Sequence, residues 1–421
     1  MTDHRPLRIA LLSYRGKPTC GGQGVYIRHL SRELAALGHT VEVIGGPPYP
    51  VLDDGVRFTA LPGLDLYAPD NPFRTPQLRE LRTLPEWIEH AGLKRGRFTE
   101  PLAFSLRARR YLRGHDFDVV HDNQGLGYGL LGIPRLVATI HHPVAIDREW
   151  ELRDVSPQRR REVLSWYRFL RMQHRVARHI PRIMTPATAG STAITEWMGV
   201  PASRLAVTPL GVDTTTFHAG STASRVPGRI VTTASADVPI KGLPNLLRAV
   251  AALPHHLGTE LHVVGTARAD GPAERLIAHL GLSHVVRFHH GLTDQQLADL
   301  IRSAEVACVP SLFEGFSLPT LEAMACATPL VTTTAGAIPE VTGPHGHAAL
   351  HAPPGDVAAL TRGLRTLLGD EAMRRRLGAG GAARASRLTW RATAEATAAV
   401  YRAHLGNIPS AEHSAEPCPK G

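Results

Sequence analysis

Two glutamates eight positions apart, Glu314 and Glu322, delimit the segment with the clearest capacity for chemistry, EGFSLPTLE. An apolar run that ends at Val309 precedes it and predicts a buried strand, after which the chain turns at Gly315. Pro319 falls in the first turn of a predicted helix, where its missing N–H costs nothing. The amides that such a turn leaves free belong to Phe316, Ser317 and Leu318. Free amides at the positive end of a helix dipole predict an anion site between the two carboxylates.

The placement of the two carboxylates suits a sugar nucleotide as the ligand of this anion site. Glu322, one turn into the helix, can reach a pair of hydroxyls on one side, and Glu314 projects toward whatever is attached to the anion on the other. A nucleotide sugar has hydroxyls on both sides of its diphosphate. A helix N-terminus that carries two glutamates by chance is the alternative, which the strand–loop–helix context disfavours.

The second half of the chain resembles the retaining glycosyltransferases of family four, or glycosyl transferases group 1, which include many bacterial mannosyl- and glucosyltransferases and sucrose synthase. The resemblance rests on the E-x7-E spacing, on AIPEV at 337–341 and on PPGD at 353–356, and it covers residues 229–405. Weaker matches in the first half are Gly-Gly at 21–22, TIH at 139–141 and GVD at 211–213. The resemblance implies the α/β fold called GT-B, in which two Rossmann-like, doubly wound parallel-sheet domains face a central cleft.

The resemblance also implies roles for single residues. Glu322 would bind the ribose of the donor and Glu314 the donor sugar, where it would support charge at the anomeric centre. Lys241, within VPIKG, matches the lysine that neutralises the leaving diphosphate, although a plain turn lysine is the alternative. His141 matches the histidine that contacts the donor sugar, although a histidine with only a structural hydrogen bond would look the same in the sequence.

Ala236 departs from the family pattern, which has an arginine five positions before the lysine. One contact to the donor phosphates is therefore missing from the expected set. The groups that can replace it are the Ser235 hydroxyl, Arg15 and Lys17.

A glycine-rich loop, CGGQG, lies between a predicted strand and a predicted helix near the start of the chain. Gly21 and Gly22 let backbone amides approach a phosphate without obstruction by side chains. In the family, a loop at this place meets the donor diphosphate and the acceptor. A dinucleotide-binding turn is the alternative, but the order G-x-G-x-x-G is absent and no acidic residue follows the strand at 40–44.

Strand and helix signals alternate in both halves of the chain, and most of the candidate site residues fall in the loops between them. In the first half, a strand at 8–13, a helix ended by Gly38 and a strand at 40–44 follow one another closely, which predicts parallel pairing. The second half contains a helix with a Thr293–Gln296 capping box. The last predicted helices are 356–368 and 390–404. Two such halves create a cleft at the carboxyl ends of their sheets, where doubly wound folds bind ligands.

A run of small and polar residues without apolar periodicity predicts the boundary between the halves. We predict an acceptor-side Rossmann-like domain at 1–213, a linker at 214–228, a nucleotide-sugar-binding Rossmann-like domain at 229–389, a helix at 390–406 that packs back on the first domain, and a disordered tail at 407–421. Two stretches that match no motif are the expected acceptor surface, residues 47–115 and 144–182.

The composition is that of an ordinary globular chain, with 421 residues, 43% hydrophobic residues and a formal net charge of +10. No apolar run approaches the roughly 20 residues that span a bilayer, so we expect a cytoplasmic protein. The positive charge favours anionic partners. Basic residues concentrate at 94–113 and 159–182, which leaves weak peripheral contact with the inner membrane surface open beside a solvated helix face. No nucleic-acid recognition module is present.

The histidines, cysteines and aspartates do not predict a metal site. The four cysteines are scattered without CxxC spacing, and adjacent histidines in a strand point to opposite faces. Asp116 and Asp118 match the DxD of metal-dependent glycosyltransferases superficially, but they precede a core strand and fit a capping turn better. We therefore expect no metal and no other cofactor.

Taken together, these patterns and the resemblance to family four imply a retaining glycosyltransferase that moves a sugar from a nucleotide diphosphate sugar, GDP- or UDP-linked, to an acceptor. The acceptor class stays open between a small metabolite, a glycan and a lipid-linked sugar, and the oligomeric state stays open as well. Three alternatives use the same architecture: a nucleotide-sugar epimerase, a phosphorylase-like enzyme and a catalytically silent nucleotide-sugar binder. An NAD dehydrogenase is a fourth alternative.

Overall fold

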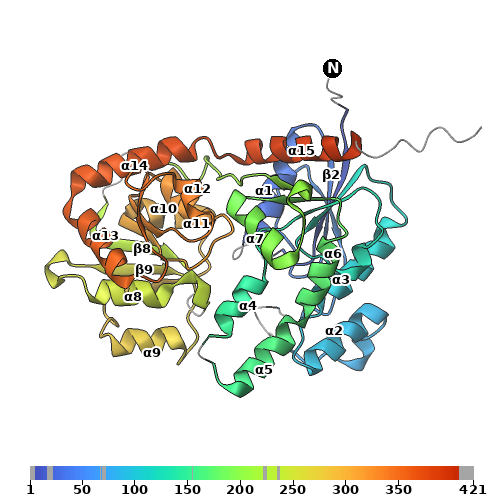
Figure 1. The fold of residues 1–421 in the computed structure, drawn as a ribbon, viewed down its shortest axis with the longest axis horizontal. Helices are drawn as coiled ribbons and strands as arrows, with labels where there is room; N and C mark the ends of the chain where they lie inside the picture. The colour runs from blue at the N-terminus through green and yellow to red at the C-terminus, as the bar shows by residue number, and fades with distance from the viewer. Residues whose placement is uncertain are drawn as a thin grey trace, which may run out of the picture.

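The computed structural model describes residues 5–16, 22–66, 68, 73–153, 155–220, 225–234 and 238–406. The predicted disordered tail, 407–421, lies outside this part of the chain. Two halves lie side by side, each built around a parallel sheet (Figure 1).

The sheet of the first half has seven described strands in the order β3-β2-β1-β4-β5-β6-β7, and all neighbours are parallel. The strands are β1 Arg8–Ser13, β2 Thr40–Gly45, β3 Arg57–Ala60, β4 Val119–Asn123, β5 Leu136–Thr139, β6 Arg182–Thr185 and β7 Leu205–Val207. β1, with the sequence RIALLS, is buried from its second residue onward, as expected of a strand that helices cover on both faces. The strand order reverses between β1 and β4, where doubly wound sheets open a ligand crevice.

The sheet of the second half has six described strands in the order β10-β9-β8-β11-β12-β13, again with parallel neighbours. The strands are β8 Val226–Thr233, β9 Glu260–Val264, β10 Val286–His289, β11 Ala304–Val309, β12 Leu330–Thr333 and β13 Ala349–Ala352. Here the order reverses between β8 and β11. The prediction of two doubly wound parallel sheets is confirmed.

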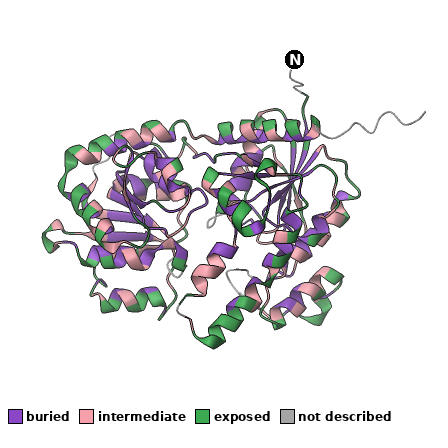
Figure 2. Cartoon of the chain, in the orientation of Figure 1, coloured by how far each residue is buried: buried purple, intermediate pink, exposed green. Residues whose placement is uncertain are grey.

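Helices cover the faces of both sheets, whose strands are largely buried (Figure 2). The α-helices are α1 Gly22–Ala36, α2 Leu84–Lys94, α3 Glu100–Leu112, α4 Ala145–Glu151, α5 Pro157–Trp166, α6 Leu170–Ala177, α7 Thr188–Met198, α8 Leu243–Ala251, α9 Pro272–His279, α10 Asp294–Ser303, α11 Leu318–Ala325, α12 Ile338–Thr342, α13 Val357–Gly369, α14 Glu371–Ala385 and α15 Trp390–Gly406. No helix among the described residues is both long and apolar enough to cross a bilayer.

Several sequence-based element predictions hold, and others need correction. The Thr293–Gln296 capping box is present at the start of α10. β8 begins at Val226, so the predicted linker at 214–228 overlaps its first residues. The sequence analysis missed α14, whose GAGGAARA stretch has neither strong helix formers throughout nor a clear apolar stripe. It also left residues 47–115 unassigned, where β3, α2 and α3 form.

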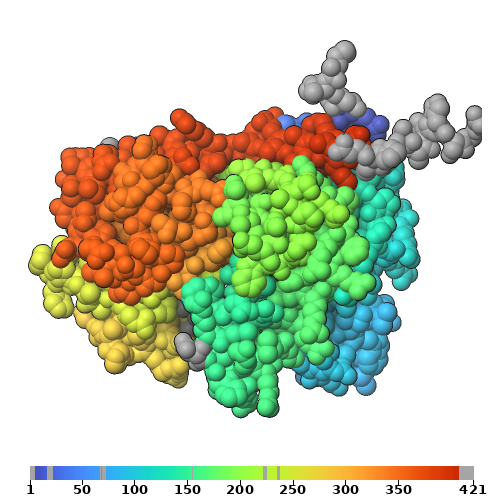
Figure 3. Space-filling model, viewed as in Figure 1, coloured from blue at the N-terminus to red at the C-terminus, as the bar shows by residue number. Residues whose placement is uncertain are grey.

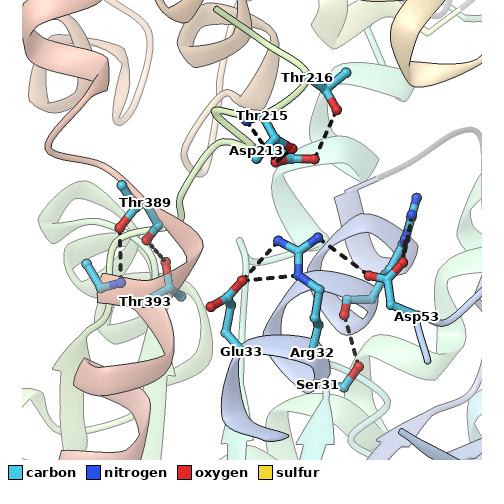
Figure 4. A network of polar contacts seen from close by, with 11 residues as sticks. Ser31, Arg32, Glu33, Asp53, Asp213, Thr215, Thr216, Thr389 and Thr393 are labelled. Carbon is cyan, nitrogen blue, oxygen red and sulfur yellow. Dashed lines mark hydrogen bonds and ion pairs between the residues drawn. The ribbon is translucent and has the colours of Figure 1, made fainter. Parts of the chain in front are cut away.

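The chain crosses twice between the halves, and a hydrogen bond and a β-bridge tie the two crossings together. Figure 4 shows Asp213, Thr215 and Thr216 at the first crossing and Thr389 and Thr393 at the second. At the first crossing, the Asp213 carboxylate accepts hydrogen bonds from the Thr215 hydroxyl at 2.7 Å and the Thr216 hydroxyl at 3.1 Å, which fixes the turn that follows β7. At the second, the Thr393 hydroxyl of α15 donates to the Pro209 carbonyl at 2.8 Å. A bridge between Val212 and Thr389 joins the two segments.

α15 runs from the second half back across the first and lies against α1 (Figure 1). Trp390, which is buried, stacks on His29 with ring centroids 5.0 Å apart. The buried Tyr401 hydroxyl lies 2.6 Å from His121 Nδ1. The last helix is therefore part of the core of the first half, while the division of the chain into separate folding domains stays a prediction.

Candidate active site

The loops after β8 and β11 bring the two most diagnostic charges together. These strands are neighbours at the point where the strand order of the second sheet reverses, so their carboxyl ends open into the same crevice. Lys241 ends a short 3₁₀ turn, η5 Pro239–Lys241, and its Nζ lies 2.9 Å from Glu314 Oε1. The Ser311 hydroxyl donates to the same oxygen at 2.6 Å. Two predicted site residues, 73 positions apart, thus form one hydrogen-bonded pair.

Glycines allow the loops of this site to pack backbone against backbone. A Cβ at Gly315 would lie 2.2 Å from the His141 carbonyl oxygen, which belongs to the loop after β5 in the first half. At Gly242, whose φ is +69°, a Cβ would lie 2.0 Å from the Pro310 carbonyl oxygen. Any side chain at either position would force the loops apart, so the sequence requirement for glycine here is steric.

The turn into α11 has the free amides that the sequence predicts. α11 begins at Leu318, and its N-cap residue Ser317 adopts a φ of 84°. Within the described part of the chain, no hydrogen bond is recorded from the amides of Phe316, Ser317 or Leu318. Unpaired amides at a helix N-terminus attract an anion, and here they adjoin the Lys241–Glu314 pair.

Glu322 carries a half-buried carboxyl group that makes no recorded hydrogen bond to the described residues. Burial, reinforced by the charge of Asp294, raises its pKa to about 7. The Glu322 carboxyl group can therefore form hydrogen bonds with the hydroxyls of a ligand. Burying a carboxyl group without a hydrogen-bond partner costs free energy. Buried carboxyl groups with a shifted pKa are typical of functional sites.

The structure places His141 at the edge of this site as a neutral imidazole. Burial, with a smaller contribution from His142, lowers its pKa to about 3. Its Nε2 lies 2.8 Å from Asn123 Oδ1, and Asn123 Nδ2 donates to the Gln23 carbonyl at 3.3 Å. This arrangement makes Nε2 the protonated nitrogen and leaves Nδ1 as an acceptor for a ligand hydroxyl.

The sequence analysis missed the neighbouring His142 as a site residue. Its Nε2 lies 2.8 Å from Asp147 Oδ2 on α4. Burial alone would lower the pKa of His142, but Asp147 outweighs that effect and raises it. The His142 Cβ lies 3.1 Å from the position that a Gly315 Cβ would take. The His142–Asp147 pair therefore borders the loop that follows β11. The only signal in the sequence is an aspartate five positions later, which no general motif covers.

The two halves contact each other on either side of these charges. Ile146 of α4 and Ala193 of α7 pack against Ile240 in one apolar cluster, which also contains Leu312 and Phe313. Glu340 of α12 caps α7 across the halves, because its carboxylate accepts from the amides of Thr188 at 2.8 Å and Ala189 at 2.7 Å. A furrow remains between α9 and the surface of α4 and α5 (Figure 3).

Not every predicted phosphate contact can be placed. Gly21, Ser235, Lys17 and Ala236 lie outside the described residues. Gly22 begins α1, and a Cβ there would lie 3.9 Å from Leu318 Cδ1, so the glycine-rich segment of the first half meets the start of α11. Of the proposed replacements for the missing arginine, Arg15 instead forms a 2.5 Å salt bridge with Glu100.

Metal coordination finds no support in the described residues, where no three His, Cys, Asp or Glu side chains are placed to hold an ion. Lys241 and the α11 amides are positive groups at the site, and the nearby Asp147 carboxylate raises the pKa of His142.

The raised pKa of Glu322 predicts a pH dependence of folding. Between about pH 5 and pH 7 the native carboxyl group holds a proton that the unfolded chain has released, so stability falls as the pH rises through this window. The loss amounts to at most about 3 kcal/mol. Glu322→Gln, which cannot ionise, should flatten this slope in denaturant unfolding measured from pH 5 to 8. The exposed Glu371→Gln is the control, and equal slopes in wild type and Glu322→Gln would contradict the assignment.

Comparison with known proteins agrees with this geometry. The chain matches the family described as Glycosyl transferases group 1 over residues 216–384 and that described as Glycosyltransferase Family 4 over residues 20–216. It is 50% identical over 410 residues to the MMP alpha-(1->4)-mannosyltransferase of Mycolicibacterium hassiacum, covering 96% of this chain and 99% of the relative. It is 30% identical to the D-inositol 3-phosphate glycosyltransferase of Kineococcus radiotolerans, covering 97% and 98%.

Solved structures share the fold. Sucrose-phosphate synthase from Thermosynechococcus elongatus superimposes with a TM-score of 0.72 at 22% identity, covering 94% of this chain and 99% of that one. WaaG, a glycosyltransferase involved in lipopolysaccharide biosynthesis, gives a TM-score of 0.68 at 16% identity, covering 93% and 99%. With its two parallel-sheet domains, the chain belongs to the retaining family-four glycosyltransferases of the GT-B fold, also called glycosyl transferases group 1.

Proposed function

We propose that this protein transfers mannose from GDP-mannose to a hydroxyl of a glycan, with retention of the anomeric configuration. The observation that carries the proposal is the Lys241–Glu314 pair at 2.9 Å beside the free amides of α11. The 50% identity to a mannosyltransferase along nearly the whole chain supports mannose as the sugar and a glycan as the acceptor. GDP as the nucleotide follows from mannose as the transferred sugar, and UDP is the alternative.

In this proposal the diphosphate binds the amides of Phe316, Ser317 and Leu318, and the ribose binds Glu322. Lys241 then exchanges its contact with Glu314 for the phosphates, where a point charge stabilises the departing nucleotide. The carboxylate of Glu314 that this exchange releases can accept hydrogen bonds from the sugar hydroxyls, and His141 Nδ1 can accept another.

The reaction itself needs no protein nucleophile in this proposal. The bond between the anomeric carbon and the β-phosphate oxygen breaks, and its electron pair leaves with the phosphate. The acceptor hydroxyl attacks the same face of the sugar, and its proton passes to the leaving phosphate oxygen. Closure of the two halves excludes the water that would otherwise hydrolyse the donor.

An array of nucleotide sugars tests the proposed donor. We expect GDP-mannose to be consumed faster than UDP-glucose, UDP-galactose or GDP-glucose, both in transfer to mannose oligosaccharides and in slow hydrolysis without acceptor. Preference for a UDP-sugar would contradict the proposed donor. Tight GDP-mannose binding in calorimetry with neither transfer nor hydrolysis would instead favour the silent binder.

Two substitutions test the charge pair. Lys241→Ala and Glu314→Ala should each lower kcat at least about tenfold, which corresponds to roughly 1.4 kcal/mol of transition-state stabilisation. Because the two side chains contact each other, the double variant should lose less than the product of the single losses. The exposed Lys94→Ala serves as the control, and rates close to wild type in both single variants would refute the assignment.

A further inference from the structure

A second group of buried charges surrounds a narrow cavity in the first half, apart from the Lys241–Glu314 pair. This inner cavity lies beyond the carboxyl ends of β1, β2 and β3, and its volume of about 10 Å³ has room for a single small polar group. Tyr14, at the end of β1, and Gly46, at the end of β2, form one wall. The charged lining residues are Asp65, Glu89, Glu100 and Arg107.

The charges of the inner cavity are held rigidly by one another. Arg107 lies between two glutamates of α2, with Nη1 2.7 Å from Glu89 Oε1 and Nη2 3.1 Å from Glu86 Oε1. Glu89 Oε2 also accepts from the Leu64 amide at 3.1 Å. Glu100 pairs with Arg15, while burial raises the pKa of Glu100 to about 8. Such buried, mutually bonded charges form a preorganised binding surface.

Two lining residues have buried polar atoms without a hydrogen-bond partner in the described part of the chain: Asp65 Oδ1 and Arg107 Nε. The first is an acceptor and the second a donor. Buried polar atoms are nearly always paired, so unpaired atoms on two residues that line the cavity make it a candidate site for a ligand or a water. A hydroxyl group both donates and accepts, and it matches this combination.

A wider hollow of about 380 Å³ adjoins the inner cavity at Gly63. Its volume falls in the range of ligand sites, roughly 300–1,000 Å³. The charged residues of this outer hollow are Arg79, Arg82, Glu80 and Glu86. Two positive and two negative side chains balance in the outer hollow. In the inner cavity Asp65 and Glu89 face Arg107, and Glu100 is paired with Arg15. The combined surface has no excess positive charge to hold a phosphate.

The inner cavity lies on the same sheet edge as His141 and connects to it through side chains. The Gln23 side chain donates a hydrogen bond to the Tyr14 hydroxyl, and the Gln23 main-chain carbonyl accepts from Asn123 Nδ2. Asn123 Oδ1 in turn contacts His141 Nε2. Only β4 separates β1 from β5. With a strand spacing of about 4.8 Å, these two carboxyl ends are roughly 10 Å apart, a distance that a few sugar units span.

We propose that the inner cavity and the outer hollow form the acceptor subsite and that they take an uncharged glycan, not a phosphorylated acceptor. One hydroxyl of the glycan enters the inner cavity between Asp65 and Arg107, and further sugar units lie in the outer hollow. This inference rests on the proposed transfer to a glycan and adds the residues and the charge that select it. Most of the lining residues belong to the stretch 47–115, part of the acceptor surface expected from the sequence, but no motif in that stretch points to these particular residues.

Calorimetric titration without donor tests this subsite separately from catalysis. Mannose oligosaccharides of one to four units should bind wild type, and binding should strengthen with length as the outer hollow fills. Asp65→Gly removes the acceptor oxygen and tolerates the residue's φ of 47°, so it should weaken oligosaccharide binding at least tenfold. Asp65→Asn, which keeps an acceptor oxygen, should lose less. The exposed Asp54→Asn is the matched control.

GDP binding and the thermal midpoint, measured on the same samples, show whether each variant is folded, and both should match wild type. Oligosaccharide binding that is absent in wild type, or equal in wild type and Asp65→Gly, would overturn the subsite. Tighter binding of mannose 1-phosphate or mannose 6-phosphate would overturn its preference for an uncharged ligand. A failure of the mannosyltransferase proposal would appear differently, as loss of GDP-mannose turnover with oligosaccharide binding intact.

Discussion

The salt bridge between Lys241 and Glu314 is the interaction on which the site depends. Both side chains come from loops that leave adjacent strands, β8 and β11, at the point where the strand order reverses. Ser311 holds the carboxylate from one side, and the glycine positions let neighbouring loops approach it. Within this arrangement the Lys241 ammonium is held in place by a carboxylate, and we propose that a diphosphate replaces that carboxylate.

The first half completes this site from across the cleft. His141 contributes a neutral imidazole whose orientation Asn123 sets, and the Nε2 of the neighbouring His142 is held by Asp147. The apolar cluster around Ile240 and the Glu340 cap on α7 hold the halves in contact beside the charges. The contact between the two halves therefore depends on residues far apart in the sequence.

The strand-to-helix turn before α11 could be predicted from the sequence because its signals are local. Gly315 and Pro319 mark a strand-to-helix turn, and the turn alone predicts free amides between Glu314 and Glu322. The Thr293–Gln296 capping box and the alternation of strands and helices can be predicted from the sequence in the same way. Each of these patterns reflects a short-range constraint on the backbone.

The sequence points to residues 47–115 as part of an acceptor surface, but the individual residues of the proposed acceptor subsite could not be predicted because they meet only through the fold. Asp65, Glu89 and Arg107 come from a turn and two helices within a stretch that has no apolar period. The only sequence signal of the His142–Asp147 pair is an aspartate five positions after a histidine. The sequence of α14 likewise lacks a clear apolar stripe. Long-range juxtaposition of this kind leaves no fixed spacing in the sequence.

The mechanism proposed above requires that Lys241 leave Glu314 and bind the diphosphate of the donor. A crystal structure of the protein with GDP measures this directly. The account predicts the diphosphate at the amides of Phe316, Ser317 and Leu318, with Lys241 Nζ moved from Glu314 to a phosphate oxygen. A diphosphate bound elsewhere, with the Lys241–Glu314 pair intact, would contradict it.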